Sequence, residues 1–403
     1  MDIYADVVIV GTGVGGLFAA LNIEPHKKVV LITKSDMESS DSFLAQGGIC
    51  VERDDDDYES YFEDTMKAGH YENRKESVDI MIRSSREIIE DLVSYGVEFE
   101  KKDGEFAYTR EGAHSKPRIL YHEDITGQEI TSKLLERAKE RKNISIYEYT
   151  AMTDILEENG QCIGILAEHE GAEWKIYAEN TILASGGIGG RYQHSTNFPH
   201  LTGDALDIGK KHGIRMEHLD YVQIHPTTLY SKKPGRRFLI SESVRGEGAV
   251  LYDKNGHRFV NELLPRDVVS EAIREQMKKD GTDHVWLSME HIPREDIAKH
   301  FPNICQRCQE EGYDVFKDWI PVVPAQHYFM GGIWVDSDSQ TSMERLFAAG
   351  ETSCNGVHGK NRLASNSLLE SLVFAKRAAV KIQNEEKGNE DHEFESNYHA
   401  ACC

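Results

Sequence analysis

The sequence predicts an α/β protein. Three observations support this class: a strand, a glycine motif and a helix open the chain, strands and helices alternate along most of its length, and one central region interrupts the alternation. With 403 residues, the chain is long enough for two domains and a substantial core. We therefore expect a Rossmann-like domain with a second domain inserted into it.

The first strand and the first helix flank the glycine motif. Residues 7–10 form a continuous apolar run, typical of a buried parallel strand, and residues 17–21 begin a helix. Between them, Gly11, Gly13 and Gly16 have the G-x-G-x-x-G spacing. Glycines at these positions allow a tight turn, close approach of the backbone to a pyrophosphate, and close packing of helix on strand. The motif therefore indicates a dinucleotide site at the N-terminus of the helix.

The second strand, residues 28–34, bears on the kind of dinucleotide. An acidic residue usually binds the ribose at the end of this strand, but here Thr33 and Lys34 occupy the place. A hydroxyl can still bind a ribose, and a lysine can lie near a phosphate. This departure disfavours an ordinary NAD dehydrogenase and leaves FAD open.

Composition excludes several classes of function. The net charge of −23 leaves no basic face for nucleic acid, so an anionic substrate would need local arginines. No apolar run approaches the length of a membrane span, and the N-terminus does not resemble a signal peptide. We therefore expect a cytoplasmic enzyme that contacts neither nucleic acid nor membrane.

The seven cysteines are irregularly spaced and do not form a disulfide framework. Cys305 and Cys308 form a single C-x-x-C, which we interpret as two reduced thiols on a helix rather than as a metal or redox site. Cys402 and Cys403 end a polar tail and are expected to be exposed. No metal site is predicted.

The remaining elements follow from periodicity and turn residues. Residues 39–49 and 109–115 are expected to be loops, and the acidic run 52–57 a solvated loop. Helices are expected at 58–68, at 75–95 before Gly96, at 128–141 and at 367–382. Short strands are expected between 144 and 185, with hairpin turns at 159–160 and 170–171.

Domain boundaries follow from the same pattern. We expect a nucleotide-binding domain at 1–219 and 329–383, an inserted capping or substrate domain at 220–328, and a polar tail at 384–403.

Nine motifs carry a resemblance to a known superfamily. The opening glycine motif is followed in order by segments 45–49, 183–187, 223–227, 245–248, 265–267, 327–332 and 349–351, and the motif N-R-L-A-S-N-S at 361–367 completes the series within the matching region. Together they resemble the succinate dehydrogenase and fumarate reductase flavoproteins over about residues 5–382. Within that superfamily, segment 109–115 (TREGAHS) looks like the L-aspartate oxidase family.

The resemblance implies an FAD-dependent oxidoreductase with an inserted α+β capping domain. It also implies oxidation of L-aspartate to iminoaspartate, the first step of quinolinate and pyridine nucleotide (NAD) biosynthesis, with O2 or fumarate re-oxidising the flavin. Hand-off to quinolinate synthase is an implied partnership. The chain ends near the point where the family's helical C-terminal domain begins, so that domain is expected to be absent.

The resemblance also assigns the FAD site. In the membrane-bound members a histidine bonds covalently to FAD, and Asp41 occupies that position here, so FAD is expected to be non-covalent. The implied cofactor residues are Gly11, Thr12, Gly13, Val14, Gly15, Gly16, Lys34, Asp41, Ser42, Phe43, Leu44, Ala45, Gln46, Gly47, Gly48, Asp204, Glu351, Ser367 and Leu368.

The implied substrate site is a clamp for two carboxylates, which calls for arginine and histidine. Its residues are Gln223, His225, Ser241 and Glu242 at one end, and His327 and Arg362 at the other. Arg266 matches the superfamily's proton-transfer arginine, and Glu111 would bind the ammonium group that distinguishes aspartate from succinate. The implied catalytic residues are Arg266, Glu111, His225 and His327.

Two alternatives remain open at this point. A soluble fumarate reductase or succinate-oxidising flavoprotein would share the clamp but has no need of Glu111. A non-catalytic FAD-binding electron-transfer subunit would tolerate loss of the clamp, yet every clamp position is filled.

Overall fold

The largest unit of the computed structural model is a seven-stranded sheet. The structure describes the backbone of residues 1–401 and the side chains of residues 1–385. The strand order is β7-β2-β1-β10-β9-β8, and β17 also pairs with β10. The pairs β7–β2, β2–β1, β1–β10 and β10–β17 are all parallel, as the Rossmann-like prediction requires. The strands are β1 (Asp2–Val10), β2 (Val29–Ile32), β7 (Ile144–Tyr147), β8 (Thr150–Glu158), β9 (Gln161–His169), β10 (Ala172–Leu183) and β17 (Leu346–Ala348).

Strands β8, β9 and β10 extend this sheet as an antiparallel meander. Their two hairpin turns have consecutive residues with positive φ, Asn159 and Gly160 in one and Glu170 and Gly171 in the other. Two such residues in a row form the turn whose twist matches that of antiparallel strands. Both predicted hairpins are confirmed.

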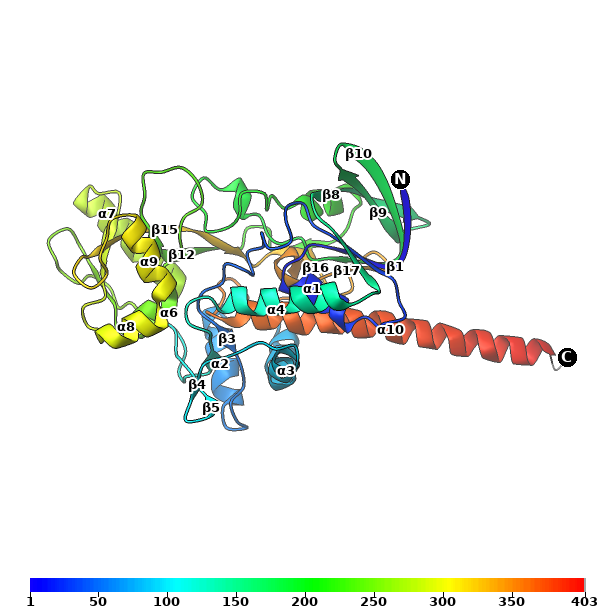
Figure 1. The fold of residues 1–403 in the computed structure, drawn as a ribbon, viewed down its shortest axis with the longest axis horizontal. Coiled ribbons are helices and arrows are strands. Elements are labelled where there is room, and N and C mark those ends of the chain that lie inside the picture. Colours follow the sequence, from blue (N-terminus) through cyan, green and yellow to red (C-terminus); the bar gives the residue numbers. More distant parts are fainter. Residues whose placement is uncertain (402–403) are drawn as a thin grey trace.

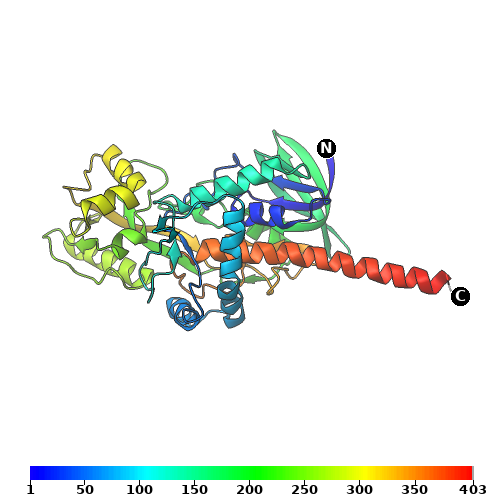
Figure 2. The ribbon, with the colours of Figure 1, turned by 60° about the horizontal axis from the view of Figure 1, so that its bottom comes forward.

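Helices cover one face of the sheet. Figures 1 and 2 both show α1 (Val14–Asn22), α4 (Thr126–Glu140) and α10 (Asn366–Ala401) side by side. The helices α2 (Tyr58–Ala68) and α3 (Lys75–Ser94) pack against each other, and α3 contacts α10. A buried cluster of apolar side chains joins all five helices to the sheet. This packing fixes the N-terminus of α1 directly beyond β1.

A second apolar cluster lies on the other face of the sheet. It includes side chains of α5 (Asp204–Lys211) and of β16 (Gly332–Trp334), the central strand of a small sheet with β11 (Met216–Glu217) and β18 (Ser353–Cys354). Two further strand pairs are β3 (Ile49–Cys50) with β6 (Ile119–Leu120) and β4 (Lys101–Lys102) with β5 (Glu105–Phe106). Short 3-10 turns occur at η1 (Gly189–Arg191) and η2 (Gly350–Thr352).

A separate four-stranded sheet, with the order β12-β15-β14-β13, forms the core of what we call the capping region (220–328). Every member of its apolar cluster lies between Leu229 and Val322. Figure 1 shows this region at one end of the molecule, beside the sheet layer rather than over it. Its domain boundaries stay a prediction. The elements are β12 (Val222–Leu229), α6 (Glu242–Gly246), β13 (Val250–Tyr252), α7 (Arg266–Asp280), β14 (Val285–Ser288), α8 (Arg294–His300), α9 (Pro302–Glu310) and β15 (Ile320–Phe329).

The C-terminal helix is longer than the sequence pattern predicted. We expected it to end at Ile382 and residues 384–403 to form a polar tail, but α10 continues to Ala401 and extends beyond the body of the molecule (Figure 1). Residues 383–401 contain no proline and a single glycine, so nothing in the sequence stops the helix. Cys402 and Cys403 lie outside the described residues. No helix within the described part of the chain is long and apolar enough to cross a membrane.

Candidate active site

A continuous pocket runs from the N-terminus of α1 to the junction with the capping region. It is lined by residues from both regions, including β12 and β15 of the capping sheet. Three predicted cofactor residues, Val14, Gly16 and Phe43, do not line it. All the other predicted cofactor residues line the pocket: Gly11, Thr12, Gly13, Gly15, Lys34, Asp41, Ser42, Leu44, Ala45, Gln46, Gly47, Gly48, Asp204, Glu351, Ser367 and Leu368.

The glycine motif is required by close contacts at the start of the pocket. A Cβ at Gly11, where φ is +112°, would lie 2.1 Å from the carbonyl oxygen of Ala184, and a Cβ at Gly16 would lie 1.9 Å from that of Gly11. The N-cap residue Gly13 supplies no side-chain cap for α1. The Val14 N–H donates to Ser42 Oγ at 3.2 Å, and the backbone of Gly13 and Gly15 lines the pocket, so the first turn of α1 offers the close backbone approach that a pyrophosphate requires.

Lys34 and Asp204 form the wall next to this turn. Lys34 Nζ lies 2.5 Å from Asp204 Oδ2 and donates a hydrogen bond to Thr202 Oγ1 at 3.0 Å. The ion pair neutralises the lysine that replaces the usual ribose-binding acid. The hydroxyls and carboxylate gathered here suit the ribose and phosphate groups of a dinucleotide.

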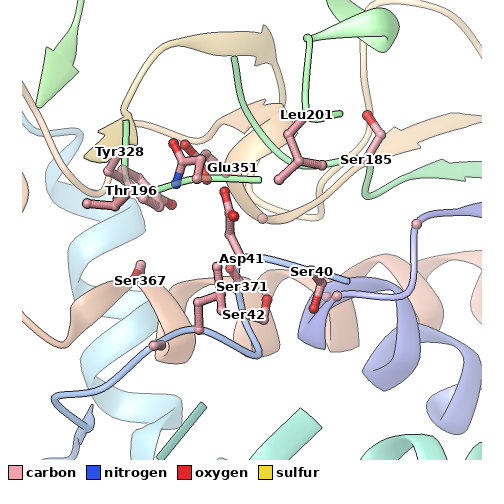
Figure 3. Close-up of a pocket in the computed structure, with 18 of the residues that line it drawn as sticks. Ser40, Asp41, Ser42, Ser185, Thr196, Leu201, Tyr328, Glu351, Ser367 and Ser371 are labelled. Atoms are coloured by element: carbon pink, nitrogen blue, oxygen red, sulfur yellow. The ribbon is translucent and has the colours of Figure 1, made fainter. Parts of the chain in front are cut away.

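Two carboxyl groups, Asp41 and Glu351, point toward each other deeper in the pocket (Figure 3). Asp41 Oδ1 accepts a hydrogen bond from the Phe198 N–H at 2.9 Å, and Glu351 Oε1 accepts one from the Phe329 N–H at 2.8 Å. Burial raises the pKa of Asp41 to about 7 and the pKa of Glu351 to about 8. The pair therefore retains a proton near neutral pH.

At the capping end, Arg266 joins two predicted substrate residues. Its Nε donates to Glu242 Oε2 at 2.5 Å, and its Nη1 donates to Gln223 Oε1 at 2.9 Å. Gln223 in turn donates to the carbonyl oxygen of Arg362 at 2.8 Å. Burial alone would raise the pKa of Glu242, but the charges of Arg266 and Arg245 outweigh burial and lower it. Glu242 is therefore ionised.

His225 presents a hydrogen-bond donor to the pocket. Its Nδ1 accepts a hydrogen bond from the Thr227 N–H at 3.2 Å, so the neutral ring carries its hydrogen on Nε2. Within residues 1–385, the buried Nε2 has no partner. Burial, and then the charge of Arg266, lower the pKa of His225 well below its usual value. The ring is therefore neutral, and its free N–H is available to a ligand.

His327 and Arg362 complete the predicted clamp. The ring centroids of His225 and His327 are 5.1 Å apart, and burial lowers the pKa of His327 well below its usual value. Arg362 donates to Ser367 Oγ at 3.0 Å and lies over the Tyr328 ring at 4.5 Å. Its Nε has no partner among the described side chains and backbone groups, and burial lowers the pKa of Arg362 to about 10. An unpaired buried guanidinium favours an anionic ligand.

Glu111, only 3% exposed, lies where three segments meet. Its Oε1 accepts a hydrogen bond from Ser243 Oγ at 2.8 Å, and its Oε2 accepts one from Ser365 Oγ at 2.5 Å. A Cβ at Gly47 would lie 2.3 Å from Oε1, so the glycine of the 45–48 loop makes room for the carboxylate. Burial, and then the charge of Glu242, raise the pKa of Glu111.

A buried ionic cluster anchors the loop that carries Glu111. Arg118 is fully buried and donates to both oxygens of Asp57, at 3.0 and 3.2 Å, and to Asp64 at 2.6 Å. It also donates to His114 Nδ1 at 3.0 Å, which leaves the Nε2–H of His114 to donate to the Ala364 carbonyl. The loop is thereby tied to the segment that holds Ser365.

This cluster corrects one prediction. The acidic run 52–57 is solvated only at residues 53–56, because Glu52 and Asp57 are buried. A run of like charges predicts a solvated loop, but the sequence does not reveal a partner 61 residues away such as Arg118.

Comparisons with known proteins identify the family of this chain. A family model described as an FAD binding domain matches residues 6–368. The L-aspartate oxidase of Clostridium perfringens is 50% identical over 381 residues, which cover 94% of this chain and 87% of its own. The chloroplastic L-aspartate oxidase of Oryza sativa is 39% identical over 93% of this chain and 62% of its own.

The chain belongs to the L-aspartate oxidase family.

Solved structures agree on the fold. An E. coli quinol fumarate reductase chain superposes with a TM-score of 0.90 at 31% identity, over 95% of this chain and 70% of its own. The open conformation of a flavocytochrome c3 fumarate reductase gives a TM-score of 0.74 at 25% identity, over 94% of this chain and 78% of its own. The fold and the FAD cofactor expected for the L-aspartate oxidase family are confirmed.

Sequence reasoning assigned no role to three residues of this site. Arg245 is fully buried, lies 3.5 Å from Glu242 and donates to the Glu262 carbonyl. Ser243 and Ser365 hold Glu111. Arg245 and Ser365 both lie inside motifs that resemble the succinate dehydrogenase and fumarate reductase flavoproteins, so their motif positions were an available signal. Ser243 gave no such signal.

We expect the cluster around Arg118 to be important for stability. Replacing Arg118 with Met leaves Asp57 and Asp64 without their buried partner, so the free energy of unfolding should fall by about 3 kcal/mol. Thermal denaturation of the flavin-loaded protein measures this. Arg83→Met removes an exposed pair with Asp79 and is the matched control, which should melt close to the wild-type temperature. Equal losses in both variants would contradict the assignment.

Proposed function

We propose that this chain oxidises L-aspartate to iminoaspartate at a bound FAD, the first step toward quinolinate and pyridine nucleotides. The observation that supports it most strongly is that buried positive charge exceeds buried negative charge at the substrate end of the pocket. A separate carboxylate, that of Glu111, lies at the same end. Arg245, Arg266 and Arg362 are buried together, and Glu242 is the ionised carboxylate in contact with the first two. A dianionic ligand balances this charge, while Glu111 suits an ammonium group.

In the proposed complex, each carboxylate of the substrate lies near its own set of residues, and the charge of Arg266 offsets that of Glu242. One carboxylate lies near Gln223, His225, Ser241 and Glu242, and the other near His327 and Arg362. The free N–H of His225 and the unpartnered Nε of Arg362 support this arrangement, because each needs an acceptor that the protein does not provide. These contacts orient the α-carbon toward the flavin end of the pocket.

The chemistry divides between cofactor and protein. FAD, held by the pocket residues next to the glycine motif, would supply the two-electron chemistry, with N5 as the hydride acceptor and O2 or fumarate as the final electron acceptor. Glu111 binds the ammonium group and takes the proton that the nitrogen must lose, and its raised pKa suits this exchange. Arg266 stabilises negative charge during aspartate oxidation and donates a proton when fumarate is reduced.

The two alternatives are less well supported. A fumarate reductase without amino-acid activity does not explain why a carboxylate, Glu111, is buried beside the clamp. Fumarate itself, however, has the two carboxylates that the clamp would bind. A non-catalytic FAD-binding subunit leaves the unpartnered donors of His225 and Arg362 unexplained. We also propose transfer of the product to a quinolinate synthase, since an enzyme of that kind consumes iminoaspartate.

Adding L-aspartate to the purified yellow protein without oxygen should bleach the flavin. Admitting air should then restore the colour and produce hydrogen peroxide, which a peroxidase-coupled assay measures. Succinate at the same concentration is the control and should bleach much less, because it has no ammonium for Glu111. Bleaching by succinate but not by L-aspartate would favour the fumarate reductase alternative. No bleaching by either would favour the electron-transfer subunit.

Glu111→Gln should separate the two reactions. The amide keeps the shape of the side chain but removes the charge, so kcat/KM for L-aspartate should fall by about 100-fold. Fumarate reduction by a reduced dye should change by less than about threefold, because fumarate has no ammonium. Equal losses in both reactions would refute the role of Glu111.

Acid precipitation should release all of the yellow colour into the supernatant. Asp41 occupies the position of the histidine that bonds covalently to FAD in the membrane-bound members, and a carboxylate cannot form that histidyl link. The absorbance of the supernatant and of the redissolved pellet measures the partition. A pellet that stays yellow after washing would show a covalent flavin.

A further inference from the structure

Ser243 connects the capping region to the carboxylate of Glu111. It lies in the first turn of α6, and its hydroxyl donates to Glu111 Oε1 at 2.8 Å. The other oxygen, Oε2, is bound by Ser365, which lies in the segment before α10. Each oxygen of Glu111 therefore has one hydroxyl donor, and the two donors come from different regions of the molecule.

The hydroxyl of Ser243 also accepts a hydrogen bond, which fixes its direction. Ser241 Oγ donates to Ser243 Oγ at 3.1 Å, and Ser241 Oγ accepts the Ser243 N–H at 3.2 Å. When Glu111 is ionised, its carboxylate only accepts hydrogen bonds, so the chain runs one way, from Ser241 through Ser243 to Glu111. Ser241 is a predicted substrate residue, so this chain connects the carboxylate-binding side of the pocket to the ammonium-binding side.

Two glycines bring the Glu111 loop close enough for this contact. A Cβ at Gly246 would lie 2.4 Å from the Arg110 carbonyl oxygen, and a Cβ at Gly112 would lie 2.4 Å from Glu242 Oε1. The loop and α6 thus pack backbone to backbone. Buried hydrogen bonds in such tight packing hold a side chain in one orientation.

We propose that Ser243 is a positioning residue that aims Glu111 at the substrate ammonium and so contributes to selection of L-aspartate over dicarboxylates without an amino group. This rests on the proposed function of Glu111. With Ser365 alone, Glu111 would be held through one oxygen and could rotate away from the ammonium. Ser243 itself does not line the pocket. Because Ser243 belongs to the capping region, the grip on Glu111 exists only when that region is packed against the loop.

The test is Ser243→Ala in the flavin-loaded enzyme. We expect kcat/KM for L-aspartate to fall by about 10-fold, because a hydrogen bond to a charged group is lost. Fumarate reduction should change by less than about twofold, because Glu111 plays no part in binding fumarate. Ser270→Ala is the matched control: this buried serine of α7 donates to the Ile224 carbonyl and does not contact Glu111. It should leave the ratio of the two activities unchanged.

The pH dependence of kcat/KM for L-aspartate is a second measurement. It would not change if Ser243 only stabilised the fold. The Ser243 hydrogen bond lowers the pKa of Glu111, so its loss should raise that pKa and move the acidic limb of kcat/KM for L-aspartate to higher pH. The charged groups acting on Glu111 are Glu242, Arg245, Arg266 and Arg362, and none of them is altered. Buried Cys50 is also near and is unchanged.

The outcomes separate this inference from the proposed function. Ser243→Ala with wild-type selectivity and an unmoved limb, beside a Glu111→Gln variant that loses aspartate oxidation, would overturn the role of Ser243 alone. A wild-type enzyme that does not oxidise L-aspartate would overturn the proposed function itself. Parallel losses of both activities in Ser243→Ala and Ser270→Ala would show general damage to the capping region and would also overturn the inference.

Discussion

At the substrate end of the pocket, three buried arginines share one ionised carboxylate, that of Glu242, and the rest of the site depends on this excess of positive charge. An isolated buried charge is strongly unfavourable unless it is paired and hydrogen-bonded. Each arginine is partly satisfied: Arg245 by Glu242 and a carbonyl, Arg266 by Glu242 and Gln223, and Arg362 by Ser367 and the face of Tyr328. Arg266 and Arg362 line the pocket, and the Nε of Arg362 has no partner among the described residues. In the proposed complex, a dianionic ligand balances the charges of these arginines rather than merely filling a space.

The need to gather these charges explains why two regions share one site. Glu242, Arg245 and Arg266 come from the capping region, and Arg362 and Glu111 from the rest of the chain. Strand β12 carries His225, and strand β15 carries His327. The last residue of β15, Phe329, binds Glu351 through its N–H, so the same strand reaches the flavin end. Neither region forms the site alone, and the packing between them is part of the chemistry.

The sequence predicted what depends on local pattern and on motif order. The helices at 58–68 and 75–94, the two hairpins and the parallel strands on either side of the glycine motif follow from periodicity and turn residues. Contacts between distant segments did not follow. Asp57 is paired with Arg118, 61 residues away, and Ser243 with Glu111, 132 residues away. Periodicity shows which face of an element is apolar, but not which polar residue meets another across the fold.

The two glutamates of the substrate pocket show how position, rather than residue type, sets charge. Glu242 and Glu111 are both buried, but Glu242 contacts two guanidinium groups and its pKa is lowered, whereas Glu111 contacts two hydroxyls and its pKa is raised. Pairs of groups with pKa values pushed apart can divide the work of one site. Glu242 stays ionised and offsets the arginines, while Glu111 is free to exchange a proton. In the proposed complex, the substrate ammonium favours the ionised form of Glu111, so the amino substrate itself promotes the charge that binds it.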